Sequence, residues 1–324
     1  MDTKKYKIGV VGLGPVGLIL ASHLKEADCD IAVCDMVKEK MNLIRNEGII
    51  LVGKMEKKCF VNYAFSTLDE ILNHDIDILV CAVKAYHVDY ILDQIVKHNH
   101  NDDLLIISAQ NGIGVAQIYA NRFVESRVFR MVVNFAGNLF APHTVNVTFF
   151  NPPNYIASKD DSRNDVSQWF AEVLSSVGLS TESTDSFTQS YKVWEKTILN
   201  AALSPLCAIS RLTMKEAMSD PDTNEIVEKL ILEAMEVAKA EEIKLPDNFV
   251  KLCIRYLKSA GDHFPSLAVD LMNKRETEIE FMNGKIVEFG RKHYIRTPLN
   301  LTFTNLVRVI TNKNKSQLKG SGSL

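Results

Sequence analysis

An apolar run followed by three closely spaced glycines constrains this 324-residue chain more than any other stretch. Residues 8–21 have the sequence IGVVGLGPVGLILA, in which Gly12, Gly14 and Gly17 have the spacing G-x-G-x-x-G. The pattern predicts a buried parallel strand, a tight turn, and a helix with Pro15 in its first turn. The free N–H groups at such a helix N-terminus suit a pyrophosphate. We expect Gly12 to permit the turn, Gly14 the close approach of a phosphate, and Gly17 the packing of helix against strand.

A second predicted strand ends in a carboxylate about twenty residues further on. Residues 31–35, IAVCD, end in Asp35, where a dinucleotide-binding fold places the acid that binds a ribose 2′-hydroxyl. The alternative is a signal peptide, because lysines at 4, 5 and 7 precede a short apolar stretch. The glycines and proline within that stretch, and the lack of a cleavage pattern followed by a disulfide framework, favour the dinucleotide site.

Composition excludes several other classes of function. The net charge of −3 and the pI near 6.3 give no electrostatic footprint for nucleic acid. No apolar run approaches the ~20 residues that span a bilayer. The six cysteines are scattered without a C-x-x-C pair, and no His or carboxylate cluster has metal-ligand spacing. We therefore expect free thiols, no metal site, no membrane association and a cytoplasmic location.

Strands that alternate with helices predict an α/β fold with a doubly wound parallel sheet. Two predicted strands of this sheet end next to polar residues, Lys84 and Asn111. Ligands bind at the carboxyl ends of such strands, so these side chains belong to the cofactor edge. The alternatives are a solvated lysine and an ordinary Asn-Gly turn. The expected strands cover residues 48–53, 59–65, 78–83, 104–108 and 127–133, with an antiparallel section at 145–149 and 154–157.

A polar connector at 181–188 marks the predicted domain boundary. We expect a dinucleotide-binding Rossmann domain over 1–187 and an all-helical domain over 188–312, where the apolar spacing is helical almost throughout. The polar, glycine-containing residues 313–324 predict a flexible tail. The expected helices of the second domain cover residues 190–212, 222–241, 246–259, 266–282, 284–293 and 300–311.

The first of these helices carries a polar stripe on an otherwise apolar surface. Lys196, Asn200 and Ser204 follow one another at four-residue intervals, and Pro205 is expected to kink the helix and expose the stripe to a cleft. A lysine in a buried helix needs a partner or a function. The alternative is that Lys196 reaches solvent along its apolar stem and Asn200 caps a neighbouring loop.

A second set of polar residues repeats every four positions within 266–282. We expect Ser266, Asp270, Lys274 and Glu278 to share one helical stripe. An ordinary surface pair of Asp270 with Lys274 explains part of this pattern equally well.

Together these motifs resemble the ketopantoate reductase family. The resemblance extends from the first strand to about residue 310 and implies a Rossmann domain and a helical domain, with the active site in the cleft between them. It implies reduction of a small 2-keto acid by a nicotinamide cofactor. The motifs that carry it are the glycine loop, Val83-Lys84-Ala85, Gln110-Asn111-Gly112-Ile-Gly114, Trp194-Glu-Lys196-x3-Asn200, Ser266-x3-Asp270-x7-Glu278, Asn283-Gly284 and Thr297-Pro298-x-Asn300.

The resemblance also implies roles for individual residues. Lys196 is expected to protonate the keto oxygen as hydride arrives, a role that suits a cationic donor in a dry cleft. Glu278 is expected to hold a substrate hydroxyl or to orient Lys196. The expected substrate-binding set is Asn111, Lys196, Asn200, Ser204, Ser266 and Glu278; the expected cofactor-binding set is Gly12, Leu13, Gly14, Pro15, Val16, Gly17, Asp35, Lys84 and Asn111.

Three departures from the family pattern affect these expectations. Ser204 stands where the family often has Asn, and Tyr294 stands where it usually has Gly, so we expect the turn at 294 to differ. Asp35 stands where NADP users commonly have no acid and an arginine nearby. A carboxylate there favours NAD(H) over NADP(H), although Lys38 and Lys40 partly compensate its charge.

Three hypotheses follow from the sequence. The first is a 2-dehydropantoate 2-reductase. The second is an NAD-dependent 2-hydroxyacid dehydrogenase that acts on other branched or aromatic 2-keto acids. The third is a dinucleotide-binding sensor or scaffold, which the joint retention of Lys196, Asn200, Ser266 and Glu278 disfavours. The family also suggests a homodimer formed through the helical domain.

Overall fold

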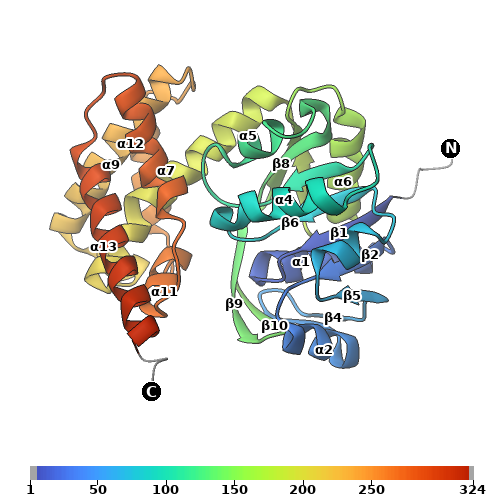
Figure 1. The fold of residues 1–324 in the computed structure, drawn as a ribbon. Helices are drawn as coiled ribbons and strands as arrows, with labels where there is room; N and C mark the ends of the chain where they lie inside the picture. The colour runs from blue at the N-terminus through green and yellow to red at the C-terminus, as the bar shows by residue number, and fades with distance from the viewer. Residues whose placement is uncertain (1–5, 321–324) are drawn as a thin grey trace. The chain divides into compact units, whose positions relative to one another are not determined.

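The computed structural model describes residues 6–320, which form two compact units (Figure 1). Residues 6–110 and 115–189 make up the N-terminal unit, and residues 111–114 and 190–320 make up the helical unit. The chain thus passes to the helical unit at 189/190, two residues beyond the expected boundary at 187/188. The segment 111–114 belongs to the helical unit, although the sequence analysis places it within the Rossmann domain.

The N-terminal unit is built on an eight-stranded sheet with the order β12-β11-β8-β7-β6-β1-β2-β5. Neighbouring strands run parallel except β11, which is antiparallel to β8. The central strands are buried on both faces, as continuous apolar runs require. The bounds are β1 Lys7–Val11, β2 Asp30–Cys34, β5 Tyr63–Phe65, β6 Ile78–Cys81, β7 Leu105–Ser108, β8 Val128–Val132, β11 Asn154–Ser158 and β12 Thr181–Ser183.

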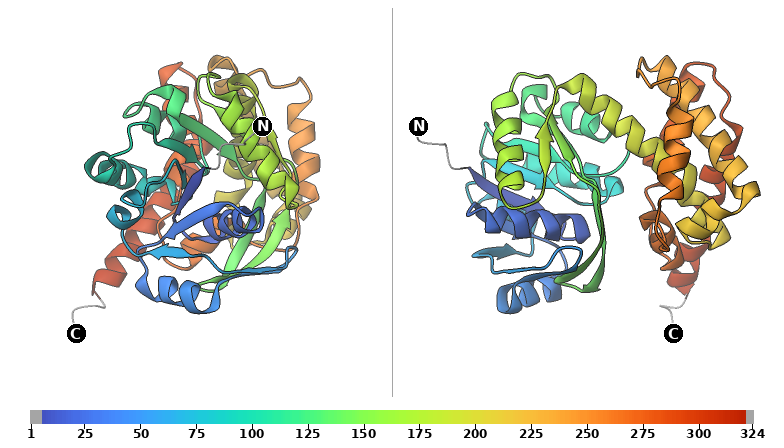
Figure 2. Two further views of the ribbon diagram at one scale, coloured as in Figure 1. Left: turned by 90° about the vertical axis from the view of Figure 1, so that its right-hand side faces the viewer. Right: turned by 180° about the vertical axis from the view of Figure 1, so that it is seen from behind.

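Helices cover both faces of this sheet, which gives the expected doubly wound fold. Figures 1 and 2 show α4 and α6 on opposite faces of it. A capping box formed by Thr67 and Glu70 begins α3. The bounds are α1 Pro15–Glu26, α2 Lys38–Glu47, α3 Leu68–Leu72, α4 Val88–His98, α5 Val115–Ala120 and α6 Asn164–Ser176, with 3-10 turns η1 Ala85–His87 and η2 Glu125–Arg127.

A second, four-stranded sheet packs against α1 and was not predicted as a separate layer. Its order is β4-β3-β10-β9, with bounds β3 Ile49–Gly53, β4 Lys57–Cys59, β9 Phe135–Ala141 and β10 Thr144–Phe150. The single strand expected over 59–65 is therefore wrong. Residues 60–62 turn the chain from β4 in the small sheet to β5 at the edge of the large one.

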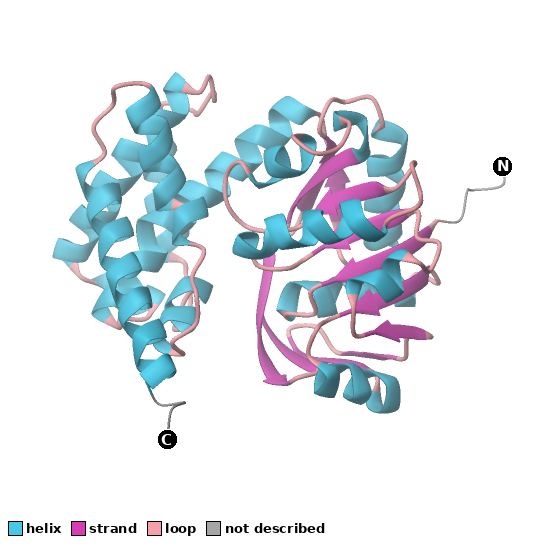
Figure 3. Cartoon of the chain, in the orientation of Figure 1, coloured by secondary structure: helices cyan, strands magenta, loops and turns pink. Residues whose placement is uncertain are grey.

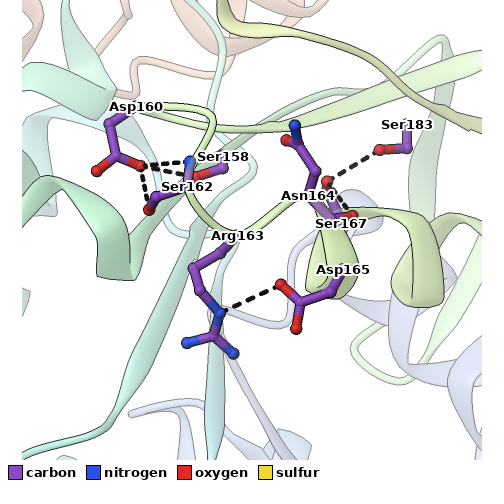
Figure 4. A network of polar contacts seen from close by, with 8 residues as sticks. All are labelled: Ser158, Asp160, Ser162, Arg163, Asn164, Asp165, Ser167 and Ser183. Atoms are coloured by element: carbon purple, nitrogen blue, oxygen red, sulfur yellow. Dashed lines mark hydrogen bonds and ion pairs between the residues drawn. The ribbon is translucent and has the colours of Figure 1, made fainter.

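A polar loop connects β11 to α6 (Figure 4). One carboxylate oxygen of Asp160 accepts hydrogen bonds from the hydroxyls of Ser158 and Ser162, at 3.0 and 2.7 Å, and from the backbone N–H of Ser162. At the start of α6, the hydroxyls of Ser167 and Ser183 lie 2.9 Å apart. These hydrogen bonds satisfy polar groups of the turn locally and help to define its path.

The helical unit contains helices and turns, and no strand, over residues 190–320 (Figure 3). Its core contains Trp194, Ile198, Ile231 and Phe249 among many aliphatic residues. None of its helices, and no other helix within residues 6–320, is long and apolar enough to cross a membrane. The bounds are α7 Ser186–Ser210, α8 Met214–Ser219, α9 Pro221–Ala240, α10 Phe249–Lys258, α11 Ser266–Met272, η3 Ile279–Phe281, α12 Asn283–Lys292 and α13 Pro298–Gly320.

The helix predicted over 266–282 ends early. α11 stops at Met272, and Lys274 adopts the left-handed conformation with a φ of +57°. The N–H of Arg275 donates to the carbonyl of Asp270 at 2.8 Å, and the N–H of Lys274 donates to that of Leu271 at 3.1 Å. This pair of bonds is a Schellman motif. The sequence does not indicate this motif, because its left-handed residue is Lys274 rather than glycine.

Two expectations near the C-terminus also need correction. The tail predicted to be flexible from residue 313 continues α13 as far as Gly320, and Lys315 pairs with Glu276 at 3.1 Å; residues 321–324 lie outside the described part. The turn at Tyr294 keeps a glycine-like backbone, with a φ of +58°. Its ring is 96% exposed, so the left-handed conformation brings no side-chain clash with the core.

Candidate active site

The glycine loop joins β1 to α1 with the geometry that the three glycines predict. Gly12 has a φ of +88°, and a Cβ there would lie 2.6 Å from the backbone nitrogen of Val83. A Cβ on Gly17 would collide with the carbonyl oxygen of Gly12, so Gly17 lets α1 pack against the strand end. A Cβ on Gly14 would meet no atom within 4 Å. Gly14 is also the N-cap of α1, and the open space beside it fits the approach of a phosphate to the helix N-terminus.

Asp35 is held against this loop at the carboxyl end of β2. Its Oδ2 accepts a hydrogen bond of 3.0 Å from the N–H of Leu13 and one of 2.8 Å from Nζ of Lys40. Its Oδ1 accepts a hydrogen bond of 3.0 Å from the N–H of Val37. The acid and the glycine loop are therefore hydrogen-bonded to each other, at the strand end where a dinucleotide-binding fold places its ribose-binding acid.

Lys84 and Asn111 follow two neighbouring parallel strands, β6 and β7. Lys84 is half-buried and precedes the 3-10 turn η1. Asn111 is half-buried and follows Gln110 directly after β7. Both residues stand at the carboxyl ends of their strands, as predicted.

A buried polar network fixes the strand end that leads to Asn111. The hydroxyl of Ser108 donates to Gln110 at 2.7 Å, and the Gln110 amide donates to the hydroxyl of Tyr119 at 2.9 Å. Nη1 of Arg130 donates to the carbonyl of Ser108 at 3.1 Å. Burial raises the pKa of the Tyr119 hydroxyl well above its usual value, which keeps it protonated. No short-range pattern in the sequence marks this network, because its members lie on β7, the loop after it, α5 and β8.

The segment after Asn111 packs with the helical unit rather than with the sheet. The N–H of Ile113 donates to the carbonyl of Phe281 at 2.9 Å, and the Ile113 side chain belongs to the core of the helical unit. Gly112 has a φ of +97°, and a Cβ there would lie 2.6 Å from the Phe281 carbonyl oxygen. Only glycine permits this close approach.

The predicted polar stripe on α7 is present on one face of that helix. Lys196 and Asn200 are half-buried, and Ser204 is 5% exposed. The helix is continuous from Ser186 to Ser210 with Pro205 inside it. The four-residue intervals therefore place the three side chains in a row.

Pro205 leaves one carbonyl of α7 without its usual helical partner, because proline has no N–H. That carbonyl belongs to Ala201, and it accepts a hydrogen bond of 2.9 Å from the side-chain amide of Asn283. The same amide donates to Asn300 at 3.0 Å. The Asn300 amide in turn donates to the Glu233 carboxylate at 2.8 Å. This relay runs from α9 through α13 and α12 to α7, and it gives a role to the asparagines of the Asn-Gly and Thr-Pro-x-Asn motifs.

The second expected stripe is wrong. Ser266 is exposed in the first turn of α11, Lys274 lies in the left-handed turn beyond that helix, and Glu278 precedes η3. The buried Asp270 pairs with Arg275 at 3.0 Å rather than with Lys274. Glu278 is only 4% exposed. Ser266 and Glu278 therefore lie on different elements and do not share one face of a helix.

The structure brings together Gly12, Leu13, Gly14 and Asp35 in one unit, and Lys196, Asn200 and Ser204 in the other. Over residues 6–320, no cluster of three or more His, Cys, Asp or Glu side chains has the arrangement of a metal site. The six cysteines are free thiols, and burial raises the pKa of Cys81, for example, to about 12. The residues whose backbone leaves room for a phosphate group are those of the glycine loop, at Gly14.

Comparison with known proteins identifies both units. Residues 8–159 match the family described as ketopantoate reductase PanE/ApbA, and residues 190–311 match its C-terminal counterpart. The 2-dehydropantoate 2-reductase of Aquifex aeolicus is 27% identical over 313 residues, which cover 93% of this chain and 96% of that protein. The enzyme of that name from Streptococcus pyogenes is 23% identical over 300 residues, with 92% and 95% covered.

Solved structures share the fold along almost the whole chain. A ketopantoate reductase from Ralstonia eutropha superposes with a TM-score of 0.85 at 23% identity, with 95% of this chain and 99% of that chain covered. A D-mandelate dehydrogenase, solved with NADH and anilino(oxo)acetate, superposes with a TM-score of 0.84 at 23% identity and the same coverage. With both family descriptions matched in order over most of its length, the chain belongs to the ketopantoate reductase family and is an NAD(P)-dependent oxidoreductase.

Proposed function

We propose that the protein is a 2-dehydropantoate 2-reductase that uses NADH. The observation that carries this proposal is the row of Lys196, Asn200 and Ser204 on α7, whose neighbouring residues 201–208 are all buried. A cation and two neutral hydrogen-bonding groups in a row suit a 2-keto acid, which presents a carboxylate and a carbonyl oxygen. The family membership and the relatives named 2-dehydropantoate 2-reductase support the same substrate.

The nicotinamide cofactor supplies the hydride when it is bound. In the proposal, the backbone of Leu13, Gly14, Pro15 and Val16 at the start of α1 binds its pyrophosphate, and Asp35 accepts a hydrogen bond from its ribose. Lys84 and Asn111 position the nicotinamide end and the substrate from their places at the strand ends. The choice of NADH over NADPH rests on the Asp35 carboxylate, which repels a 2′-phosphate.

Lys196 acts as the general acid in this proposal. Hydride addition to C2 places negative charge on the former carbonyl oxygen, and the Lys196 ammonium both stabilises that charge and donates the proton. Asn200, Ser204 and Ser266 bind the substrate's polar groups. Glu278 binds the substrate hydroxyl or orients Lys196.

The test is steady-state reduction of two keto acids by the purified protein. Ketopantoate is compared with 2-ketoisovalerate, which lacks the hydroxyl, and each is offered with NADH and with NADPH. We expect kcat/KM to favour ketopantoate with NADH by at least about tenfold, because a buried site that binds a hydroxyl discriminates against an analogue without it. Equal or better reduction of 2-ketoisovalerate would contradict the pantoate assignment and identify a 2-hydroxyacid dehydrogenase on the same fold.

The proposal extends to the oligomeric state and the cellular location of the protein. One structural relative is titled a dimeric ketopantoate reductase from Staphylococcus aureus. We propose a homodimer through the helical unit for this chain as well. Its free thiols suit the reducing cytoplasm. Sedimentation or light scattering of the purified protein checks the dimer directly.

A further inference from the structure

Lys40 lies in the first turn of α2, and its ammonium is buried beside the glycine loop. Nζ donates to Oδ2 of Asp35 at 2.8 Å and to the carbonyl oxygen of Leu13 at 3.0 Å. The side chains of Lys40 and Asp35 are 10% and 13% exposed, so little water reaches the pair. Lys38, two residues earlier on the same helix, is exposed. Lys38 and Lys40, which have the same predicted role in the sequence, thus have different environments in the structure.

A buried ammonium requires an anionic partner, because the cost of removing its hydration is otherwise uncompensated. Asp35 is that partner here. The Leu13 carbonyl oxygen is a second acceptor for Nζ, and it belongs to the glycine loop itself. Lys40 therefore stays at the carboxyl end of β2, where the fold receives the ribose of a dinucleotide.

We propose that Lys40 is a phosphate-binding cation masked by Asp35, and that this pair determines the choice between NADH and NADPH. The inference rests on the dinucleotide-binding part of the proposed function and deepens it. With Asp35 present, Lys40 orients the carboxylate and is neutralised by it. With Asp35 neutral, the same ammonium becomes the partner for a 2′-phosphate.

The remaining hydrogen-bonding capacity of Asp35 agrees with this division of roles. A carboxylate has about four acceptor positions. Among the described residues, the N–H groups of Leu13 and Val37 and the ammonium of Lys40 take three of them. One position on Oδ1 remains for a ribose hydroxyl. A 2′-phosphate offers mainly acceptors and negative charge to the same oxygen, so NADPH binds more weakly than NADH in this proposal.

Four proteins test the proposal: the wild type, D35A, the double variant D35A/K40M, and the matched control D35A/K38M. Dissociation constants for NADH and NADPH are measured by fluorescence titration without any keto acid. D35A is expected to bind NADPH at least about tenfold more tightly than the wild type does, because a charge-assisted hydrogen bond replaces a repulsion. D35A/K40M is expected to lose that gain, and D35A/K38M to keep it.

A gain that survives in D35A/K40M, or no gain in D35A, would overturn the proposal. Thermal unfolding gives a second readout. D35A leaves Lys40 without its anion, so its Tm should fall and should be restored more by NADPH than by NADH. If D35A does not fold, D35N keeps the shape of the side chain and takes its place. Because no substrate is present, an error in the assigned keto acid would leave these results unchanged.

Discussion

The side-chain amide of Asn283 donates a hydrogen bond of 2.9 Å to the carbonyl oxygen of Ala201, four residues before Pro205. It thereby replaces the N–H that proline lacks. Replacing Asn283 with Ala leaves buried acceptors on Ala201 and Asn300 unpaired. We expect a loss of about 2 kcal/mol in the free energy of unfolding. Urea unfolding in a W169F background reports on the helical unit, because Trp194 then supplies the fluorescence.

Pro205 provides the internal control for this prediction. In N283A/P205A the backbone N–H of residue 205 becomes available to the Ala201 carbonyl, so part of the lost stability should return. Replacing the exposed Asn312 by Ala should change little. If N283A is as stable as the wild type, the relay does not support α7.

Replacing Lys196 by Ala should lower kcat by about 10² to 10⁴, the usual contribution of a positioned general acid. The dissociation constant for NADH should stay nearly unchanged, because Lys196 lies outside the unit that holds the glycine loop. Lys192→Ala on the same helix is the matched control, since Lys192 pairs with Glu195 at 3.1 Å. A large loss of NADH binding in K196A, measured by titration, would remove Lys196 from the general-acid role.

Two substitutions in the glycine loop should affect cofactor binding and folding differently. Gly14→Ala adds a methyl group in open space at a φ of −71°, so thermal stability should stay close to that of the wild type. NADH affinity should nevertheless fall by at least about tenfold, because the methyl group lies where the pyrophosphate approaches. Gly17→Ala should instead reduce folded yield, since its Cβ meets the Gly12 carbonyl. Wild-type NADH affinity in a stable G14A protein would place the pyrophosphate elsewhere.

His23 makes stability depend on pH. Burial lowers its pKa from 6.5 to about 4, while its Nδ1 lies 2.7 Å from the Ile19 carbonyl. Between these two values the unfolded chain binds the additional proton, so the free energy of unfolding rises with pH. The full contribution, about 3 kcal/mol, is present above pH 6.5 and is lost as the pH falls towards 4.

Denaturant unfolding at several pH values checks this dependence. H23L should remove most of the change between pH 6.5 and 4, whereas H100L, at an exposed position, should keep it. An identical slope in H23L and the wild type would assign the effect to other groups.

Local patterns predicted most of the N-terminal unit. The glycine loop, the acid at the end of β2 and the polar strand ends each have a short-range signal, because the backbone conformation there restricts the residue type. The stripe on α7 followed from the helical period alone. What failed was the end of α11: Lys274 is a left-handed residue without the glycine that normally marks such a turn.

Specific side-chain pairings and strand partners could not be predicted. The pairing of Lys40 with Asp35 depends on how closely α2 follows β2, and the exposed Lys38 has the same residue type and the same charge. The division of residues 57–65 between two sheets depends on which edge each strand can reach. Asn283 gained its role only because the helix beside it contains a proline.

Ile113 belongs to the core of the helical unit although the chain places it between β7 and α5 of the other unit. The C-terminal part is therefore not a module that a single cut can separate. A fragment starting at Ser190 would lack a residue of its own interior. A chimera joined at Ser190 would combine the helices of one protein with segment 111–114 of another, and the residue at 113 would then have to fit a core that it did not evolve with. Segment 111–114 and the helices should therefore be exchanged between relatives together.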